Sequence, residues 1–273
     1  MKPADDVAFT ALARKICSGA GFTLGAYKDK CIRRRIAVRM RACGVHTYAD
    51  YHALLDRTPL EYDRLRDALT INVTRFYRNP ETWDLLRREL LPQLCERRRG
   101  ELHAWSAGCS SGEEPYTLSA LVAEYLDRVN RPEQLHRLTV DATDIDRVSL
   151  ERARAARYPS QALAGLPAEL AITYFEPVDG ERRVIERVRR RVAIRRLDLS
   201  TDAPVRQDYD LILCRNVVIY FDRPMQERLF QIFACSLAPG GFLVLGKVET
   251  LLGPARERLA MVDPRERVYR RPT

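Results

Sequence analysis

The chain has 273 residues, of which 46% are apolar, so it can bury a substantial core in one large domain or two small ones. The net charge of +9 indicates either an anionic partner or simply an arginine-rich proteome. Seven scattered cysteines, an N-terminus without an export signal and the lack of any apolar run near ~20 residues predict a cytoplasmic protein that is not inserted in a membrane. Only four histidines occur, none paired at ligand spacing, so we expect no metal site.

The first third of the chain has only helical patterns. A basic helix is predicted at about residues 24–42, where Lys30, Arg34 and Arg41 fall in one stripe at 100° per residue. Two later segments, Thr47-x-x-Asp50 and Thr58-Pro-Leu-Glu61, resemble capping boxes, which are typical of helix starts. A further helix is predicted to begin at Asn79-Pro80, and it would lead to a connection ending near residue 100.

A strand, a glycine-rich turn and a helix follow between residues 102 and 125. The apolar run that begins at Leu102 ends in Gly108-Cys-Ser-Ser-Gly112, and Pro115 suits the first turn of the next helix. This is the opening unit of a nucleotide-binding α/β fold, although ordinary tight turns have the same pattern. The paired acids Glu113 and Glu114 set this loop apart. Carboxylates repel a diphosphate, so we expect a ligand with positive charge, such as an amine or a sulfonium.

Strands and helices alternate in the rest of the chain, which predicts a mostly parallel sheet covered on both faces. Residues 174–199 interrupt the alternation with a hairpin-like insertion. Ligands of such sheets bind beyond the carboxyl ends of the strands, where Asp144, Asp198 and Arg215-Asn216 are predicted to lie. Asp144 is placed to hold ribose hydroxyls, with Asp146 as a competitor and a helix N-cap as the alternative. Asp198 is equally consistent with a loop aspartate, and Asn216 with a strand-end polar residue.

Five segments, in order, resemble the motifs of the chemotaxis receptor methyltransferases, the CheR family. They are Asn72-Val-Thr-Arg-Phe-Tyr-Arg78, Trp105 to Tyr116, Ala142-Thr-Asp-Ile-Asp146, Cys214 to Asp222 and Leu237-Ala-Pro-Gly-Gly241. The resemblance implies transfer of a methyl group from S-adenosylmethionine to glutamate side chains of chemoreceptors, which leaves S-adenosylhomocysteine. It also implies an α/β protein: a small N-terminal all-helical domain (1–78), a linking helix (79–100) and a Rossmann-like class I methyltransferase domain (101–273), with an antiparallel β-subdomain inserted at about 174–195.

The resemblance also assigns site residues by position. The cofactor-binding residues would be Asn72, Thr74, Arg78, Gly108, Glu113, Asp144, Asp198, Leu199, Arg215 and Asn216. Glu113 would bind the methionine amino group, with Glu114 as the less certain candidate. Arg78 and Tyr220 would orient the substrate carboxylate, which needs no general base because glutamate is mostly ionised at pH 7. The sequence departs from the family at Asp198, where asparagine is usual, and at Lys247-Val248, where the family has histidine and serine.

The expected partner is the glutamate-rich cytoplasmic helix of a chemoreceptor, held by the stripe of Lys30, Arg34 and Arg41; the alternative is a solvated basic face. The turn around residues 177–180 looks short, so we expect that the protein needs no C-terminal pentapeptide tether on the receptor. We also expect a monomer. Two other functions compete. A nucleic-acid methyltransferase is disfavoured because Arg215-Asn-Val-Val replaces the N/D-P-P-Y/F segment and no Pro-Cys occurs. An inactive cofactor-binding regulator is the other alternative, and the presence of Glu113, Asp144 and Asn216 argues against it.

Overall fold

The computed structural model describes residues 3–20, 23–69, 73–97 and 100–273. The chain forms two compact units, residues 1–71 with 220–225 and residues 72–219 with 226–273. Asn72, assigned above to the cofactor site, lies outside the described residues. Within the described part, no helix is long and apolar enough to cross a membrane.

The first unit is helical. It contains α1 (Pro3–Ala20), the 3-10 helix η1 (Leu24–Ala26), α2 (Asp29–Ala42), α3 (Tyr48–Arg57) and α4 (Leu60–Leu69). The basic helix predicted at about 24–42 therefore starts later, at Asp29, after a separate 3-10 turn. Residues 220–222 join this unit by pairing with 26–28: the Lys28 N–H donates to the Tyr220 carbonyl at 2.9 Å, and Tyr27 and Phe221 form an antiparallel bridge.

A polar network around the buried Glu61 joins α2, α3 and α4. Arg39 donates two hydrogen bonds to the Glu61 carboxylate, at 2.7 and 2.8 Å, and Tyr51 Oη donates a third at 2.9 Å. Burial alone would raise the pKa of Glu61, but the bonds from Arg39 and Tyr51 bring it below its usual value. The capping-box prediction is therefore wrong for Glu61, because its carboxylate turns into the core. It is right for Thr47, whose Oγ1 accepts the Asp50 N–H at 3.1 Å.

The second unit begins with a helical stretch that starts at Pro80, as predicted. This stretch comprises α5 (Pro80–Leu85), the π-helical turn η2 (Leu86–Leu90) and α6 (Leu91–Arg97). The main sheet then has the strand order β6-β2-β1-β7-β8-β10-β9. Its strands are β1 (Leu102–Ala107), β2 (Leu138–Asp144), β6 (Val192–Arg196), β7 (Tyr209–Cys214), β8 (Leu237–Leu245), β9 (Ala260–Asp263) and β10 (Val268–Arg270).

The first five strands in this order are parallel, and β10 and β9 are antiparallel additions at one edge. Strand β7 is buried along its whole length, as is typical of a parallel sheet covered on both faces. The connecting helices are α7 (Glu113–Arg128), η3 (Pro132–Arg137), α8 (Arg147–Ala155), η4 (Ser160–Gly165), α9 (Ala168–Thr173), α10 (Glu186–Arg189), η5 (Val218–Tyr220), α11 (Arg223–Ser236) and α12 (Ala255–Arg258).

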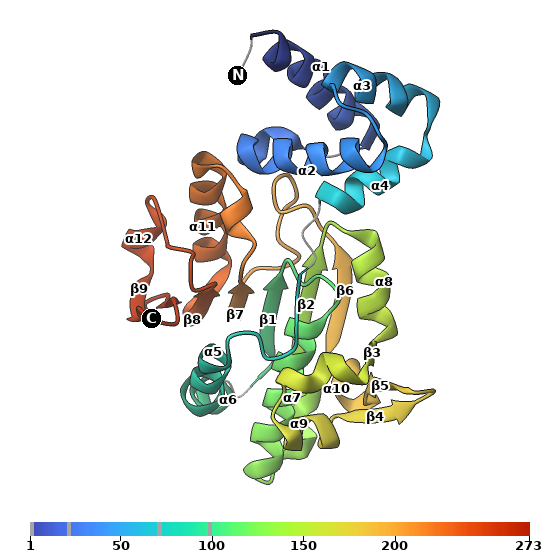
Figure 1. Ribbon diagram of the computed structural model, residues 1–273. Coiled ribbons are helices and arrows are strands. Elements are labelled where there is room, and N and C mark those ends of the chain that lie inside the picture. Colours follow the sequence, from blue (N-terminus) through green and yellow to red (C-terminus); the bar gives the residue numbers. More distant parts are fainter. Residues whose placement is uncertain (1–2, 21–22, 70–72, 98–99) are drawn as a thin grey trace. The chain divides into compact units, whose positions relative to one another are not determined.

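A small antiparallel sheet, β3-β5-β4, stands apart from the main sheet, next to α10 (Figure 1). It consists of β3 (Arg157–Pro159), β4 (Phe175–Val178) and β5 (Glu181–Val184). The inserted sheet is thus present as expected, with two differences from the range 174–195. The sheet recruits β3 from before that range, and residues from Val192 onward belong to the main sheet. Sequence periodicity alone could not reveal β3, because it has only three residues.

Candidate functional site

The carboxyl ends of the parallel strands share one edge of the main sheet, and the predicted site segments follow these strands. The loop 108–112 follows β1, Asp144 ends β2, Asp198 follows β6, and Arg215 with Asn216 follows β7. Side chains from four separate segments are therefore collected at one edge, as the alternation of strands and helices predicts.

The loop after β1 is a tight turn. Gly108, Ser110 and Gly112 have φ angles of 85°, 48° and 97°, a region that favours glycine. The N–H groups of Gly108 and Cys109 both donate to the Thr143 carbonyl, at 2.8 and 2.9 Å. A Cβ atom at position 108 would lie 2.4 Å from Val217 Cγ2. Glycine is therefore required at 108 both for its backbone conformation and for the close approach to the loop after β7.

Asp144 and Asp146 have different tasks. Asp146 caps α8, because its carboxylate accepts the N–H groups of Val148 and Ser149 at 3.3 and 3.1 Å. The Asp144 carboxylate accepts the Ser110 N–H at 2.8 Å and the Asp146 N–H at 3.0 Å. Burial raises the pKa of Asp144, and these two N–H groups counteract the shift. The N-cap role thus falls to Asp146, while the half-buried Asp144 stays at the strand end beside the loop.

Glu113 opens α7 and is only 7% exposed. Both of its carboxylate oxygens lie within reach of Ser111 Oγ, at 2.9 and 2.8 Å. Burial raises the pKa of Glu113, whereas hydrogen bonds from its own backbone, Ser111 and Thr74 favour the charged form. Among the described residues, no lysine or arginine forms a close ion pair with it, and the charge of Arg152 favours the charged form only from a longer distance. A buried carboxylate without a close ion-pair partner is suited to receive the ammonium group of a ligand.

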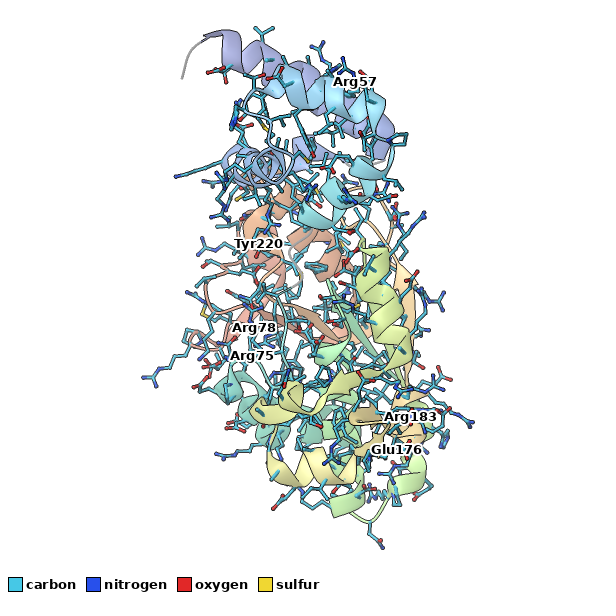
Figure 2. The ribbon with its side chains drawn as sticks, turned by 45° about the vertical axis from the view of Figure 1, so that its right-hand side comes forward. Arg57, Arg75, Arg78, Glu176, Arg183 and Tyr220 are labelled. Carbon is cyan, nitrogen blue, oxygen red and sulfur yellow. The ribbon has the colours of Figure 1, made fainter. Side chains whose placement is uncertain are left out.

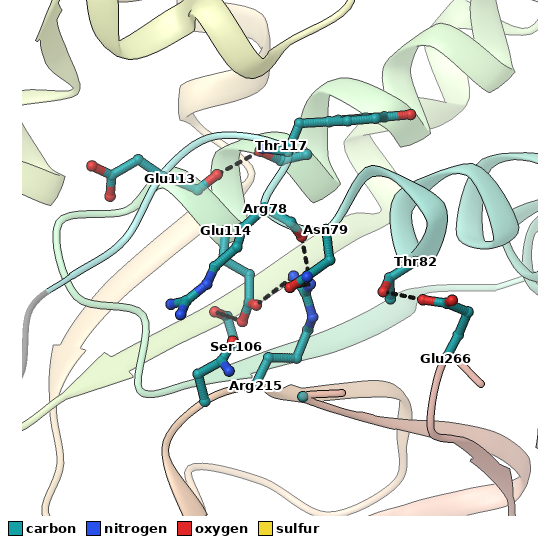
Figure 3. Close-up of polar contacts among 12 residues, drawn as sticks. Arg78, Asn79, Thr82, Ser106, Glu113, Glu114, Thr117, Arg215 and Glu266 are labelled. Carbon is teal, nitrogen blue, oxygen red and sulfur yellow. Dashed lines mark hydrogen bonds and ion pairs between the residues drawn. The ribbon is translucent and has the colours of Figure 1, made fainter. Parts of the chain in front are cut away.

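Glu114, the neighbouring acid, is used differently. It accepts a hydrogen bond from Ser106 Oγ at 2.8 Å and lies 3.4 Å from Arg215 Nη1 (Figure 3). Arg215 also donates to the Arg78 carbonyl at 2.5 Å and to Asn79 Oδ1 at 3.2 Å. The guanidinium lies over the Trp83 ring, 5.2 Å from its centroid. Glu114 and Arg215 therefore tie the site together internally, which leaves Glu113 as the acid available to a ligand.

A residue that sequence reasoning missed, Glu249, organises the loop after β7. One carboxylate oxygen accepts the N–H groups of Gly246 and Asn216, at 2.6 and 2.9 Å. The other accepts those of Val217 and Ile219, at 2.9 and 3.2 Å. Asn216 itself has a φ of 62°, and its buried Oδ1 has no hydrogen-bond partner within the described residues. The only sequence signal was the Gly246-x-x-Glu249 spacing, which by itself indicates no such role.

The segment 73–78 reaches the loop after β1. The Tyr77 N–H donates to Thr117 Oγ1 on α7 at 3.4 Å, Phe76 and Tyr77 are buried, and Thr74 bonds Glu113 as described above. Arg78 donates to the Val73 carbonyl at 2.9 Å. The structure thus brings Thr74 and Arg78 into the same cluster as Gly108, Glu113 and Arg215.

Asp198 lies in the loop after β6 and is 7% exposed. Its Oδ1 accepts the Ser200 N–H at 2.8 Å and Ser200 Oγ at 2.6 Å, so it stabilises its own turn. Leu199 is half-buried beside it. Asp198 therefore acts as a loop aspartate through Oδ1, as the alternative predicted. Contact with a bound adenine stays a prediction for both residues.

Four predicted residues belong to the first unit. Lys30, Arg34 and Arg41 are exposed on α2, and Tyr220 is held there through its backbone carbonyl. Their roles in substrate binding and catalysis stay predictions. Within the described residues, no group of three or more His, Cys, Asp or Glu side chains is arranged to hold a metal ion.

Residues 8–70 match the family description "CheR methyltransferase, all-alpha domain", and residues 72–267 match "CheR methyltransferase, SAM binding domain". The chain is 34% identical to a chemotaxis protein methyltransferase of Listeria monocytogenes, over 89% of this chain and 90% of that protein. It is 33% identical to a chemotaxis protein methyltransferase of Klebsiella aerogenes, over 93% of this chain and 87% of that protein.

Among solved structures, the chain is similar to the N-methyltransferase NodS of Bradyrhizobium japonicum, which was determined in complex with S-adenosylhomocysteine. The identity is 15% and the TM-score 0.41, over 72% of this chain and 91% of that one. The two family matches together extend over most of the chain, and the second includes the whole strand-end cluster. The chain therefore belongs to the CheR methyltransferase family, and it is a methyltransferase that uses S-adenosylmethionine.

Proposed function

We propose that the protein methylates glutamate side chains on the cytoplasmic helices of chemoreceptors. The observation that carries the proposal is the buried Glu113 carboxylate, which forms no close ion pair among the described residues and follows the loop whose Ser110 N–H binds Asp144. This arrangement fits the ammonium group and the ribose of S-adenosylmethionine. The buried Asn216 Oδ1, which has no hydrogen-bond partner within the described residues, is a further acceptor for the methionine moiety of the cofactor. The names of the relatives support a role in chemotaxis.

The chemistry needs little from the protein beyond positioning. When bound, S-adenosylmethionine supplies a methyl group on a good leaving group, and the attacking glutamate is already ionised at neutral pH. None of the strand-end residues is a histidine, and burial raises the pKa of the Cys109 and Cys214 thiols well above the usual range, so both stay protonated. Neither a general base nor a nucleophilic cysteine is required. Arg78 and Tyr220 are proposed to orient the carboxylate for in-line attack.

Transfer of labelled methyl from S-adenosylmethionine tests this function directly. A glutamate-rich receptor fragment should become labelled, and the label should be released by mild base, as expected of a carboxyl ester. The same fragment with its glutamates replaced by glutamine should stay unlabelled. Labelled RNA would indicate the nucleic-acid alternative, and tight cofactor binding without any transfer to receptors would indicate an inactive regulator.

Loss of the Glu113 charge should weaken the cofactor. A charge-assisted hydrogen bond is worth roughly 1.5–3 kcal/mol, so Glu113→Ala should lower the affinity for S-adenosylhomocysteine about tenfold to a hundredfold in calorimetry. Glu113→Gln retains an acceptor but not the charge, and it should fall between the wild type and the alanine variant. Unchanged affinity in both variants would remove Glu113 from the cofactor site.

The arginines of α2 divide into structural and exposed groups. Arg33 lies over the Phe9 ring at 3.7 Å, Arg35 donates to the Ala68 carbonyl at 2.6 Å, and Arg39 binds Glu61. The three stripe residues, by contrast, are exposed and form no hydrogen bond or ion pair within the described part of the chain. Helix packing thus leaves the stripe available, and an acidic receptor helix is a suitable partner by charge. We therefore propose this face as the receptor contact.

Reversal of the stripe should impair the receptor reaction alone. The triple variant K30E/R34E/R41E should raise the KM for receptor several-fold, because the attraction between opposite charges that steers the receptor is lost. The KM for cofactor should stay unchanged. The difference from wild type should shrink with salt, as the Debye length falls from ~10 Å at 0.1 M toward ~3 Å at 1 M.

A matched control is available within the same unit. Two double variants, R34E/R41E and R14E/R57E, reverse the same number of exposed charges. Only the first alters the stripe, because Arg14 and Arg57 lie on other helices (Figure 2 labels Arg57). Equal effects of the two variants on receptor KM, or no effect of the triple variant at low salt, would mean that the stripe is only solvated surface.

The small sheet offers little room for a docking peptide. Strands β4 and β5 have four residues each and are joined by the two-residue turn Asp179-Gly180. Arg157 bonds Asp179 at 2.8 Å and Glu181 at 3.1 Å, and Glu176 pairs with Arg183 across the hairpin at 2.7 Å (Figure 2). Short, charged edge strands oppose the addition of a further strand. We therefore propose that the protein works without a pentapeptide tether, and the monomeric state likewise stays a prediction.

Tether independence has a simple measurement. A receptor fragment with its own C-terminal pentapeptide and one without it should be methylated at the same rate. The free peptide should show no saturable binding in fluorescence anisotropy at micromolar protein concentrations. Faster methylation of the tethered fragment would contradict the proposal.

A further inference from the structure

Tyr158, the middle residue of β3, lies directly against the loop after β1. It is 4% exposed, and its Oη donates to the Ser111 carbonyl at 2.7 Å. Burial and the nearby charge of Glu113 raise the pKa of Tyr158 well above its usual value, so the hydroxyl stays protonated and acts as a donor. The small sheet therefore places a hydrogen-bond donor against the backbone of the cofactor loop.

Ser111 of the loop links Tyr158 to Glu113 by hydrogen bonds. Ser111 accepts from Tyr158 through its carbonyl, and through Oγ it donates to the Glu113 carboxylate at 2.8–2.9 Å. The next residue, Gly112, has a φ of 97°, and a Cβ atom there would lie 2.9 Å from Tyr158 Oη. Tyr158 Oη thus lies against the Ser111–Gly112 peptide, directly before Glu113 in the sequence.

Tyr158 is itself fixed by aromatic neighbours. Its ring meets Phe76 edge-on, with centroids 4.8 Å apart, and Phe76 meets Phe175 of β4 in the same way at 5.1 Å. Residue 165 also packs closely here, because a Cβ atom at Gly165 would lie 2.8 Å from the Phe76 carbonyl. Edge-to-face pairs of this kind restrict ring orientation. The hydroxyl of Tyr158 is therefore held by two strands of the small sheet and by the segment 73–78.

We propose that Tyr158 is a positioning residue for S-adenosylmethionine, through which the small sheet holds Ser111 and thereby the Glu113 carboxylate in the orientation that binds the cofactor. This inference rests on the cofactor role proposed for Glu113, but not on the identity of the methyl acceptor. It gives the small sheet a function that does not depend on binding a receptor peptide.

The variant Tyr158→Phe removes only the hydroxyl. Its affinity for S-adenosylhomocysteine should fall about threefold to tenfold in calorimetry, as expected for one hydrogen bond. The KM for S-adenosylmethionine should rise by a similar factor, and the KM for receptor should not change. Tyr174→Phe is the control: Tyr174 is equally buried, and its Oη donates to Asp127 at 2.8 Å, away from the cofactor loop. The control should lose thermal stability without losing cofactor affinity.

A double-mutant cycle separates positioning from general packing. Ser111→Ala removes the Oγ that reaches Glu113, so Tyr158→Phe should weaken the cofactor much less in the Ser111→Ala background than in the wild type. Full additivity, or equal losses of affinity in Tyr158→Phe and Tyr174→Phe, would overturn the inference.

The variant Glu113→Ala distinguishes this inference from the proposed cofactor role of Glu113. If it leaves the affinity unchanged, the role of Glu113 fails; if it weakens the cofactor while Tyr158→Phe does not, only the role of Tyr158 fails.

Discussion

A buried ion pair, Glu114 with Arg215, joins three segments that are far apart in the sequence. Its acid comes from the start of α7, its guanidinium from the end of β7, and the same guanidinium bonds the backbone and side chain of residues 78–79. Burial raises the pKa of Glu114 and lowers that of Arg215, and each charge opposes the shift in its partner. Removing one member of such a pair costs about 3–5 kcal/mol, because the other charge is left buried.

Much of the second unit follows from this constraint. With Glu114 held by Arg215, the first turn of α7 has a fixed rotation, and Glu113 is held by Ser111 and Thr74 on another side. Arg215 also holds Arg78 near the strand ends, because the Arg78 carbonyl accepts a hydrogen bond from the Arg215 guanidinium. A second carboxylate, Glu249, arranges the backbone after β7 with four N–H groups. Two internal carboxylates, Glu114 and Glu249, therefore shape the strand-end cluster, and Glu113 and Asp144 are the acids that we propose for the ligand.

The sequence predicted the architecture and the strand-end cluster because both depend on local patterns. Alternating apolar runs and helical spacing define the parallel sheet, and such sheets bind ligands at one known edge. Residue patterns alone could not tell Glu113 from Glu114, since two adjacent acids differ only in what surrounds them after folding; the preference for Glu113 came from the family resemblance. Residue patterns also missed Glu249 and Tyr158, which act through backbone groups of distant segments. For the basic residues of α2, the sequence predicted the exposed stripe but not the partners that Arg33, Arg35 and Arg39 have within the first unit.

The close approach of Gly108 to Val217 has an evolutionary consequence. Any side chain at position 108 would meet Val217 at 2.4 Å, and one at Gly246 would lie 2.7 Å from the Glu249 carboxylate. A side chain at either position would therefore clash with its present neighbour. The positive φ of Gly108 confines that position further, whereas a valine at 217 can shrink without backbone strain. Among homologues, residue 217 should therefore vary while residue 108 does not. Residue 246 should not vary either, because a Cβ atom there would also lie 2.8 Å from the Asn216 backbone nitrogen, which no change at 249 removes.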